Sequence, residues 1–280
     1  MPKNDLTKAG ARILAISAFG ALSAVGPYLY ESEERRQKKQ VETETASEQV
    51  TSTPPKLPTS TPDFSAIKDT KQKKQAFFDY LRPSITIENN RILKERAFLN
   101  RLLETEEAWT SEQTLYAKRL GKLYSLPLPQ NKIDSEWIQE MLARVNILPE
   151  ALVLTQAANE SAWGTSRFAT EASNFFGHWC YTKGCGLVPL QRNEGSTHEV
   201  AKFKSSQESV HRYFMNVNRN RAYVDLRNIR SELMANNVDL TTPETATKLS
   251  NGLLKYSERG VDYVTDLQAM IRHNSSFWVQ

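Results

Sequence analysis

The chain has 280 residues, of which 39% are hydrophobic and 24% are charged. This length is enough for one sizeable core with tails, and the averages exclude a polytopic membrane protein, a collagen-like chain and an acidic disordered protein. The 36 lysines and arginines exceed the 32 acidic residues slightly, which gives a formal net charge of +4. So small an excess is typical of a well-solvated surface and predicts no nucleic-acid partner. Two cysteines are too few for a disulfide-dense scaffold or a four-thiolate zinc site.

Residues 1–30 have the pattern of a signal anchor or a signal peptide. Lys3, Lys8 and Arg12 precede an uncharged run over residues 13–30, which is near the length of about 18 residues that a bilayer span requires. A bulky Leu22 stands where a cleavage site would need a small residue, which favours an uncleaved anchor. Since the basic cluster comes first, the remainder is expected to be periplasmic and tethered to the inner membrane, or secreted if the segment is cleaved.

Residues 31–75 have the composition of a disordered linker. The segment begins with the charged run ESEERRQKKQ and continues with sequence rich in Thr, Glu, Ser and Pro. It contains few large apolar side chains, so burial would not offset the entropy lost on ordering. We therefore expect a flexible tether.

From residue 76 onward, apolar residues recur at helical spacing, which predicts a helical prelude over 76–147 packed on a further domain over 148–280. A first short helix is expected to end before Pro83, and a second to run to about Trp109. Ser111 and Ser135 are predicted to cap the next two helices.

Helical spacing fails only between residues 177 and 204, where glycines and both cysteines gather. There we expect loops and a small hairpin, 187–190 against 199–203, with its turn at 193–195. Beyond it, a capping box over 241–244 predicts a helix to about residue 255, and a last helix is expected over 261–273. The fold class is therefore mainly α (α+β), a helical domain with a small β-hairpin lobe after an N-terminal membrane anchor and linker.

Glu160 is the strongest catalytic candidate. On a helix, Val153, Ala157 and Glu160 share one face, so the carboxyl lies on the apolar side close to the helix end. Burial against apolar neighbours raises a carboxyl pKa, which lets the group stay protonated and act as a general acid. An ordinary helix glutamate with a surface partner is the alternative.

Several segments together resemble glycoside hydrolase family 73, the peptidoglycan N-acetylglucosaminidases. The resemblance covers about residues 148–273, and the matching segments are Gln156–Gly164 (QAANESAWG), Asn174–Gly177 (NFFG), 201–209 (AKFKSSQES), Asn220–Tyr223 (NRAY) and Tyr256–Tyr263 (YSERGVDY). It implies a lysozyme-like fold, a helical lobe and a small β-lobe over a cleft, with Glu160 as the catalytic acid. It also implies that Tyr223 orients the sugar or stabilises positive charge near the anomeric carbon, whereas a packed tyrosine is the alternative.

Glycoside hydrolysis usually needs a second carboxylate. The resemblance implies one on the first strand of the hairpin, but residues 187–192 contain no acid. Glu194 at the turn and Glu199 on the returning strand are the nearest candidates. The 2-acetamido group of the substrate is the third possibility, because substrate-assisted glycosidases dispense with the second carboxylate.

Aromatic side chains are the candidates for binding sugar rings. Trp163, Trp179 and Tyr181 can stack on the C–H faces of a sugar, although core packing is favoured for Trp163. Residues 174–177, which include Asn174, Phe176 and Gly177, are expected to form the floor of the cleft, since Gly177 permits close approach of the backbone.

Cys180 and Cys185 enclose a four-residue loop, and in an exported domain such a pair favours a disulfide. Metal binding together with His178 is the alternative, but no fourth ligand lies near in sequence, so no metal site is expected.

The sequence thus predicts a peptidoglycan hydrolase. The resemblance implies an endo-β-N-acetylglucosaminidase that cleaves the β-1,4 bond after N-acetylglucosamine in glycan strands, without a metal or organic cofactor. Two alternatives remain: a lytic transglycosylase that cleaves after N-acetylmuramic acid with a lone glutamate, and a non-catalytic module that binds peptidoglycan.

Overall fold

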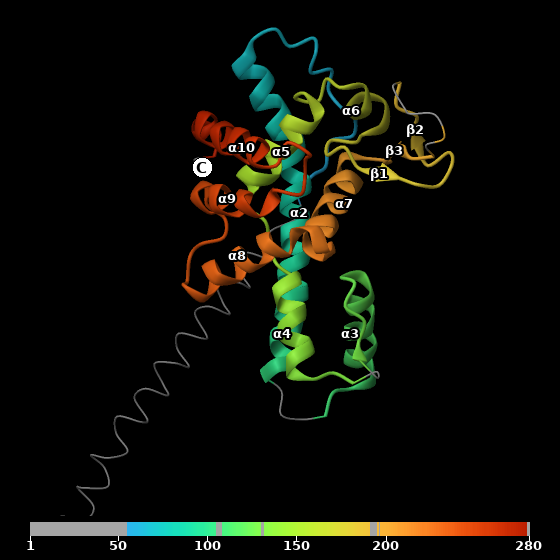
Figure 1. The fold of residues 1–280 in the computed structure, drawn as a ribbon, viewed down its shortest axis with the longest axis vertical. Coiled ribbons are helices and arrows are strands. Elements are labelled where there is room, and N and C mark those ends of the chain that lie inside the picture. The colour runs from blue at the N-terminus through green and yellow to red at the C-terminus, as the bar shows by residue number, and fades with distance from the viewer. Residues whose placement is uncertain (1–54, 105–107, 130–131, 191–194, 196, 279–280) are drawn as a thin grey trace, which may run out of the picture. The chain divides into compact units, whose positions relative to one another are not determined.

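The computed structural model describes residues 55–104, 108–129, 132–190, 195 and 197–278 (Figure 1). The predicted anchor, most of the predicted linker and Glu194 lie outside these residues. Among the helices of the described part, none combines the length and the apolar run that a bilayer crossing requires.

The folded region begins before residue 75, where the linker was expected to end. Helix α2 starts at Thr70, and Phe64 is already buried, with its ring 5.5 Å from Phe77 and 5.8 Å from Tyr80. The Thr61 hydroxyl lies 2.8 Å from the Tyr80 hydroxyl. The prediction of a linker to residue 75 is therefore wrong at its end, because Phe64 and Ile67 of this polar segment pack on the core.

Helix α2 (Thr70–Glu104) is one continuous helix that contains Pro83, whereas two helices separated at Pro83 were expected. Phe77, Phe78 and Leu81 before the proline and Ile85 after it are all buried. A proline inside a helix costs about 3 kcal/mol. Burying each large apolar side chain contributes about 1.5–3 kcal/mol, so packing on both sides of Pro83 outweighs the missing hydrogen bond.

Two shorter helices follow, α3 (Ser111–Leu123) and α4 (Ser135–Arg144). Their N-caps are Thr110, which forms a capping box with Gln113, and Asp134, whose side chain accepts from the Trp137 amide. The caps predicted at Ser111 and Ser135 are thus wrong by one residue. Each of these serines follows another residue that can cap a helix, so composition could not decide between them.

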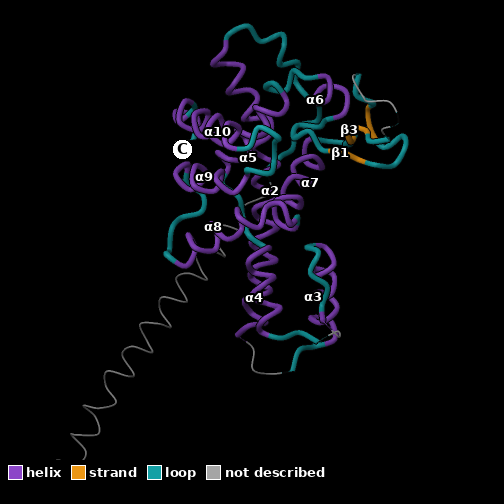
Figure 2. Tube along the Cα trace, in the orientation of Figure 1, coloured by secondary structure: helices purple, strands orange, loops and turns teal. Residues whose placement is uncertain are grey.

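The centre of the chain forms α5 (Glu150–Ser161), α6 (Arg167–Ala172) and a three-stranded sheet. The strands are β1 (Trp179–Cys180), β2 (Gly186–Leu187) and β3 (Glu199–Ala201), in the order β1-β3-β2. The predicted antiparallel pairing is present, with Leu187 opposite Val200, but β2 begins earlier and both strands are shorter than expected. The sequence did not predict β1, which is only two residues long. Figure 2 shows the strands together beside α6 and α7.

The C-terminal part is helical. It contains α7 (Ser206–Arg219), α8 (Val224–Ala235), α9 (Pro243–Ser250) and α10 (Val261–His273), with short 3-10 helices at Arg221–Tyr223, Asn251–Leu253 and Ser275–Phe277. Helix α10 has the bounds predicted from the sequence. Helix α9 is capped by Thr242 and ends at Ser250 rather than near residue 255.

The helices share one hydrophobic core. Helix α2 contacts α4, α5 and α7, while α5 also contacts α9 and α10 (Figure 1). The connected set of buried apolar residues runs from Phe64 to Ile271. The predicted prelude and the predicted catalytic domain therefore contribute to the same interior.

Arg230 on α8 ties the two regions together. It is fully buried, and its guanidinium donates to the carbonyl groups of Ala143, Arg144, Asn146 and Ile147 at 3.0–3.2 Å. Burial, together with the charges of neighbouring arginines, lowers its pKa to about 9. Arg230 thus caps the C-terminal end of α4 from a helix more than 80 positions further along the chain.

We expect Arg230→Met to lower the free energy of unfolding by about 3 kcal/mol or more, because several buried carbonyl groups lose their donor at once. Urea denaturation followed by circular dichroism measures this loss. The matched control is Arg119→Met on the exposed face of α3, which should change stability by less than about 0.5 kcal/mol. Equal effects of the two substitutions would contradict the role of Arg230.

Candidate active site

Glu160 lies in the last turn of α5, and the backbone just after it fixes where the helix ends. Ala162, Trp163 and Gly164 all have left-handed conformations, with φ of 49°, 58° and 76°. The Ser161 hydroxyl donates to the Ala157 carbonyl at 2.6 Å and accepts from the Gly164 amide at 2.9 Å. Two consecutive non-glycine residues in this region are unfavourable, so the surrounding packing must hold the turn.

Gly164 is required by that packing. A Cβ atom at this position would stand 2.5 Å from the Phe64 ring, which is too close for any side chain. Phe64 therefore presses directly on the turn that ends α5. In this way the segment that precedes α2 supports the position of Glu160.

The Glu160 carboxyl is half-buried, and a chain of hydrogen bonds orients it. Tyr213 donates to Gln156, Gln156 donates to the Tyr263 hydroxyl at 2.8 Å, and Tyr263 donates to Glu160 Oε1 at 2.9 Å. The Asn159 amide donates to the same oxygen at 3.3 Å. Burial raises the pKa of the Glu160 carboxyl above its usual range, although the two donated hydrogen bonds oppose the shift.

The second oxygen, Oε2, is the one that can carry a proton toward a ligand. Oε1 already accepts two hydrogen bonds, whereas Oε2 has no hydrogen-bond partner among the described residues. Gly177 stands next to Oε2, and a Cβ atom there would be 3.8 Å from it. Gly177 has a φ of 67°, so a larger residue would be strained there and would extend over the carboxyl.

Aromatic rings form one wall beside Glu160. Tyr256 stacks on Tyr263 with ring centroids 5.6 Å apart and nearly parallel planes, and it lies 5.9 Å from Tyr223. The Tyr256 hydroxyl donates to the Phe176 carbonyl at 3.0 Å. Burial and nearby Glu160 raise the pKa of Tyr263 and of Tyr256, so both phenols stay protonated and remain donors.

These groups line a pocket of about 440 Å³. It brings together six of the residues that the sequence singled out, namely Glu160, Phe176, Gly177, Trp179, Tyr181 and Tyr223. The remaining lining residues are His178, Arg212, Asn216, Asn220 and Tyr256. Trp179 and Tyr181 are exposed, at 44% and 77%, so their rings are free to contact a ligand at the rim.

Two of the expected binding residues have other positions. Trp163 packs against Phe77 and Phe78, with centroids 5.8 and 5.4 Å away, and Lys74 lies over its ring. Its role is therefore the core packing that the sequence favoured. Asn174 is buried outside the pocket lining and binds the carbonyl groups of His178 and Ala201 at 2.9 Å, which holds the loop that carries the pocket floor.

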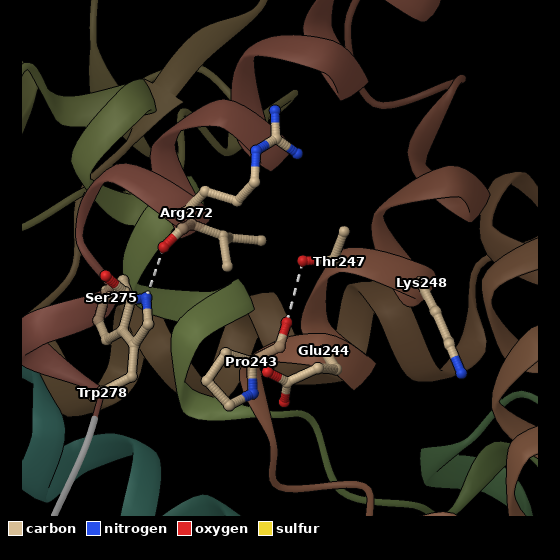
Figure 3. A pocket seen from close by; sticks show the side chains of 8 residues that line it. Pro243, Glu244, Thr247, Lys248, Arg272, Ser275 and Trp278 are labelled. Atoms are coloured by element: carbon tan, nitrogen blue, oxygen red, sulfur yellow. Dashed lines mark hydrogen bonds between the residues drawn. The ribbon is translucent and has the colours of Figure 1, made fainter.

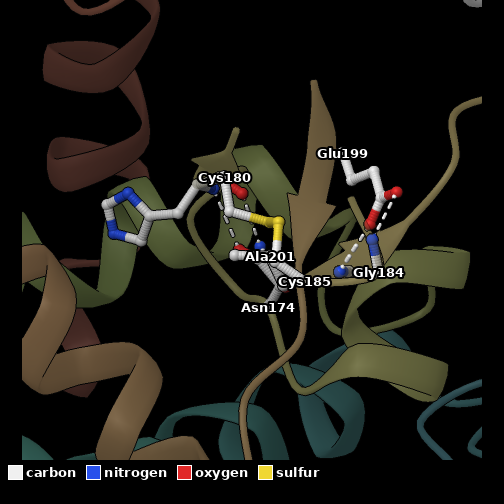
Figure 4. The surroundings of a disulfide bond; sticks show 8 residues. Asn174, Cys180, Gly184, Cys185, Glu199 and Ala201 are labelled. Atoms are coloured by element: carbon white, nitrogen blue, oxygen red, sulfur yellow. Dashed lines mark hydrogen bonds between the residues drawn. A yellow bond between two sulfur atoms is a disulfide. The ribbon is translucent and has the colours of Figure 1, made fainter. Parts of the chain in front are cut away.

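Glu199 also turns away from the pocket. Its two carboxylate oxygens accept from the amides of Gly184 at 3.0 Å and Gly186 at 2.8 Å (Figure 4). Because both oxygens are engaged by the loop, the geometry does not place Glu199 as the second catalytic carboxylate. Glu194 lies outside the described residues.

Cys180 and Cys185 are joined by a disulfide that closes the same loop (Figure 4). In the described part of the chain, the group with the spacing of metal ligands is Cys180, Cys185 and Glu199. The disulfide occupies both sulfur atoms, so these residues do not fit a metal ion. The loop and the Glu199 clamp together position Trp179 and Tyr181, which flank Cys180 at the pocket.

Comparison with known proteins agrees with this geometry. Residues 135–276 match the model of the glucosaminidase family, described as mannosyl-glycoprotein endo-beta-N-acetylglucosaminidase. The chain belongs to the glucosaminidase family. It is also 32% identical over 215 residues to protein bax of Escherichia coli (strain K12), a match that covers 77% of this chain and 74% of that protein. No solved structure matches the chain, so the lysozyme-like arrangement stays a prediction.

Membership of the glucosaminidase family supports glycan hydrolysis by this chain, with a glycan such as peptidoglycan as the substrate. The sequence did not single out Arg212 and Asn216 on α7, and it pointed to Asn220, just after α7, only as the first residue of a matching segment. Their spacing of four places them on one helical face, a signal that the sequence already contained. Gln156 and Tyr263 stood in the matching segments, but nothing local showed that they contact each other.

A second groove lies between α9 and α10 and includes Trp278 (Figure 3). Its volume is about 480 Å³. Its walls are mainly apolar, and the Trp278 ring is held by a hydrogen bond to the Ile271 carbonyl at 2.8 Å. Its acid, Glu244, is exposed to solvent. The groove therefore lacks the desolvated, oriented carboxyl that the Glu160 pocket has.

Glu160→Gln should stabilise the fold at neutral pH, because the folded state resists ionising Glu160 and the unfolded state does not. Because the pKa of Glu160 is raised in the folded state, the substitution should not change stability at pH values below the ordinary glutamate pKa. The increase in stability should appear as the pH rises above that value and be complete above the pKa of Glu160 in the folded state. Thermal unfolding at several pH values measures it.

The matched control for this pH series is Glu232→Gln on the exposed surface of α8. It removes the same negative charge from a carboxyl that is exposed and therefore carries no desolvation cost. A pH-independent effect of Glu160→Gln, equal to that of the control, would show that burial does not perturb Glu160.

Proposed function

We propose that this chain is an endo-β-N-acetylglucosaminidase that hydrolyses the β-1,4 bond after N-acetylglucosamine in peptidoglycan. The observation that carries the proposal is the Glu160 carboxyl, which is desolvated, held by Tyr263 and open to a pocket on its other oxygen. Membership of the glucosaminidase family and the resemblance to peptidoglycan N-acetylglucosaminidases support the choice of bond and polymer.

In this proposal Glu160 is the general acid. As the bond between C1 and the leaving oxygen breaks, the proton on Oε2 passes to that oxygen, and the carboxylate that remains is stabilised by the hydrogen bonds to Oε1. A water molecule then adds to C1 and returns a proton to Glu160. The Tyr263 hydroxyl orients the carboxyl in both steps and strengthens its hydrogen bond when Glu160 becomes negative.

Tyr223 is proposed to act next to the anomeric carbon. Its ring lines the pocket, and the Asn216 amide lies 3.5 Å from its hydroxyl. Burial raises the pKa of Tyr223, so the phenol remains neutral and can donate to the sugar or place its oxygen near developing positive charge. Trp179 and Tyr181 at the rim are proposed to stack on neighbouring sugar rings.

The second catalytic group is proposed to be Glu194 or the 2-acetamido group of the substrate. Among the described residues that line the pocket, Glu160 is the one acid. Glu194→Gln distinguishes the two candidates. A loss as large as that of Glu160→Gln assigns the role to Glu194. Retained activity, together with competitive inhibition by a thiazoline analogue of N-acetylglucosamine, assigns it to the acetamido group.

Glu160→Gln should lower kcat on purified peptidoglycan by at least about 100-fold, since general acid catalysis contributes a factor of roughly 10²–10⁴. Release of soluble glycan fragments measures the loss. Full activity of Glu160→Gln would contradict the proposal.

Tyr263→Phe should shift the alkaline limb of the pH–rate profile to higher pH, because the lost hydrogen bond had lowered the pKa of Glu160. The same release of glycan fragments, followed across the pH range, measures this shift.

Glu199→Gln should lower kcat/KM by less than about tenfold, because this side chain holds the loop amides rather than the reacting atoms. The same digestion assay measures the change. A loss comparable to that of Glu160→Gln would show that Glu199 reaches the substrate after all.

A lytic transglycosylase is the second candidate, favoured by the single acid in the described pocket. Mass spectrometry of the digest separates the two reactions. A reducing N-acetylglucosamine end supports the hydrolase, and an anhydro-N-acetylmuramic acid end supports the transglycosylase. Peptidoglycan binding without products, unchanged by Glu160→Gln, would instead indicate a non-catalytic module.

The site is proposed to work outside the cytoplasm, on a tether formed by residues 1–30 and the linker. The basic and then apolar N-terminal sequence supports this location, as does the Cys180–Cys185 disulfide, since disulfides persist in oxidising compartments. Protease digestion of spheroplasts tests it, because an exported and anchored domain is degraded while cytoplasmic proteins are protected.

A further inference from the structure

One wall of the Glu160 pocket is a polar row along α7. Arg212, Asn216 and Asn220 follow each other at a spacing of four, and all three line the pocket. The Asn220 amide donates to Asn216 Oδ1 at 3.1 Å, and the Asn216 amide lies 3.5 Å from the Tyr223 hydroxyl. The two asparagines are thus fixed to each other and to the pocket, and Arg212 stands at the other end of the row.

Arg212 is a cation without a protein counter-ion in the described part of the chain. Its side chain is exposed, and neither a hydrogen bond nor an ion pair joins it to another described residue, Glu160 included. By contrast, the preceding residue, His211, lies 3.0 Å from the Glu88 carboxylate. The positive charge of Arg212 is therefore available at the pocket.

Among the described residues that line the pocket, the other titratable side chains do not duplicate or cancel this charge. Burial, followed by the charge of Arg212, lowers the pKa of His178 to about 4, so this ring is neutral near pH 7. Burial raises the pKa of Glu160, which reduces its negative charge before a substrate arrives. An anionic ligand thus meets a guanidinium and a carboxyl that readily stays neutral.

We infer that Arg212 is a specificity-determining residue that binds a carboxylate carried by the glycan close to the bond that is cleaved. The pocket then selects acidic amino-sugar chains over neutral ones. The inference rests on the proposed function for the identity of the glycan. The recognition itself requires only that the pocket bind a glycan.

The chemistry of arginine fits this role. A guanidinium binds a carboxylate through two parallel hydrogen bonds, and such charge-assisted bonds are about twice as strong as neutral ones. In peptidoglycan a carboxylate has two sources next to the glycosidic bond. One is the lactyl group of N-acetylmuramic acid, which is free when no peptide is attached, and the other is the attached peptide.

Binding to the full-length chain tests the inference without depending on catalysis. Glu160→Gln protein is titrated with peptide-free glycan, with peptide-bearing glycan, and with each glycan after its carboxylates are converted to methylamides. We expect the acidic forms to bind roughly tenfold more tightly than their amidated counterparts. Glu160→Gln/Arg212→Gln should lose most of this ratio, and added salt should lower the ratio of the Glu160→Gln protein.

Glu160→Gln/Arg119→Gln is the matched control. It removes one exposed arginine on α3, outside the pocket, and should keep the full ratio. This control separates a local contact from a general effect of net charge. If Arg212→Gln removes the preference for the acidic form only with peptide-free glycan, the lactyl carboxylate is the group that Arg212 binds. If it removes the preference only with peptide-bearing glycan, the peptide carries that carboxylate.

Failure of the proposed hydrolysis and failure of the inference about Arg212 give different results. If the protein with an intact Glu160 cleaves no glycan but the binding ratio depends on Arg212, the inference stands and the proposed hydrolysis fails. If the Glu160→Gln protein shows no preference for acidic glycan, or keeps it after Arg212→Gln, Arg212 does not recognise a carboxylate and the inference is overturned.

Discussion

The hydrogen bond from the Tyr263 hydroxyl to Glu160 is the contact on which the rest of the site depends. It joins the last turn of α5 to α10, 103 positions later, and fixes one carboxyl oxygen at 2.9 Å while the other faces the pocket. A carboxyl that was merely buried would lose its orientation, and one that was fully solvated would lose its proton. The combination of partial burial with a single oriented oxygen is what suits Glu160 to proton donation.

The fold around this contact explains why the pocket needs more than the segment that matches the family. Phe64, which precedes the matched segment, presses on Gly164 at the end of α5. This contact brings a residue from outside the matched segment to bear on the helix that carries Glu160. The N-terminal helices are therefore part of the scaffold that positions Glu160.

Local pattern was enough to predict the elements that depend on near neighbours. The apolar face shared by Val153, Ala157 and Glu160 showed that the carboxyl would be half-buried, and the bounds of α10 followed from its spacing and flanking residues. Contacts between distant segments could not be predicted in this way. The Gln156–Tyr263 bond, the burial of Phe64 and the turning of Glu199 toward loop amides all depend on tertiary packing, as does the continuation of α2 through Pro83.

The protonation of Glu160 is the central claim, and an NMR titration of its side-chain carboxyl carbon measures it most directly. The signal is assigned by its absence from the Glu160→Gln spectrum and followed across the pH range in the folded protein. The account predicts a midpoint clearly above the ordinary glutamate pKa of about 4.3. A midpoint at or below that value would contradict the account, because the carboxyl would then be ionised whenever a substrate entered the pocket.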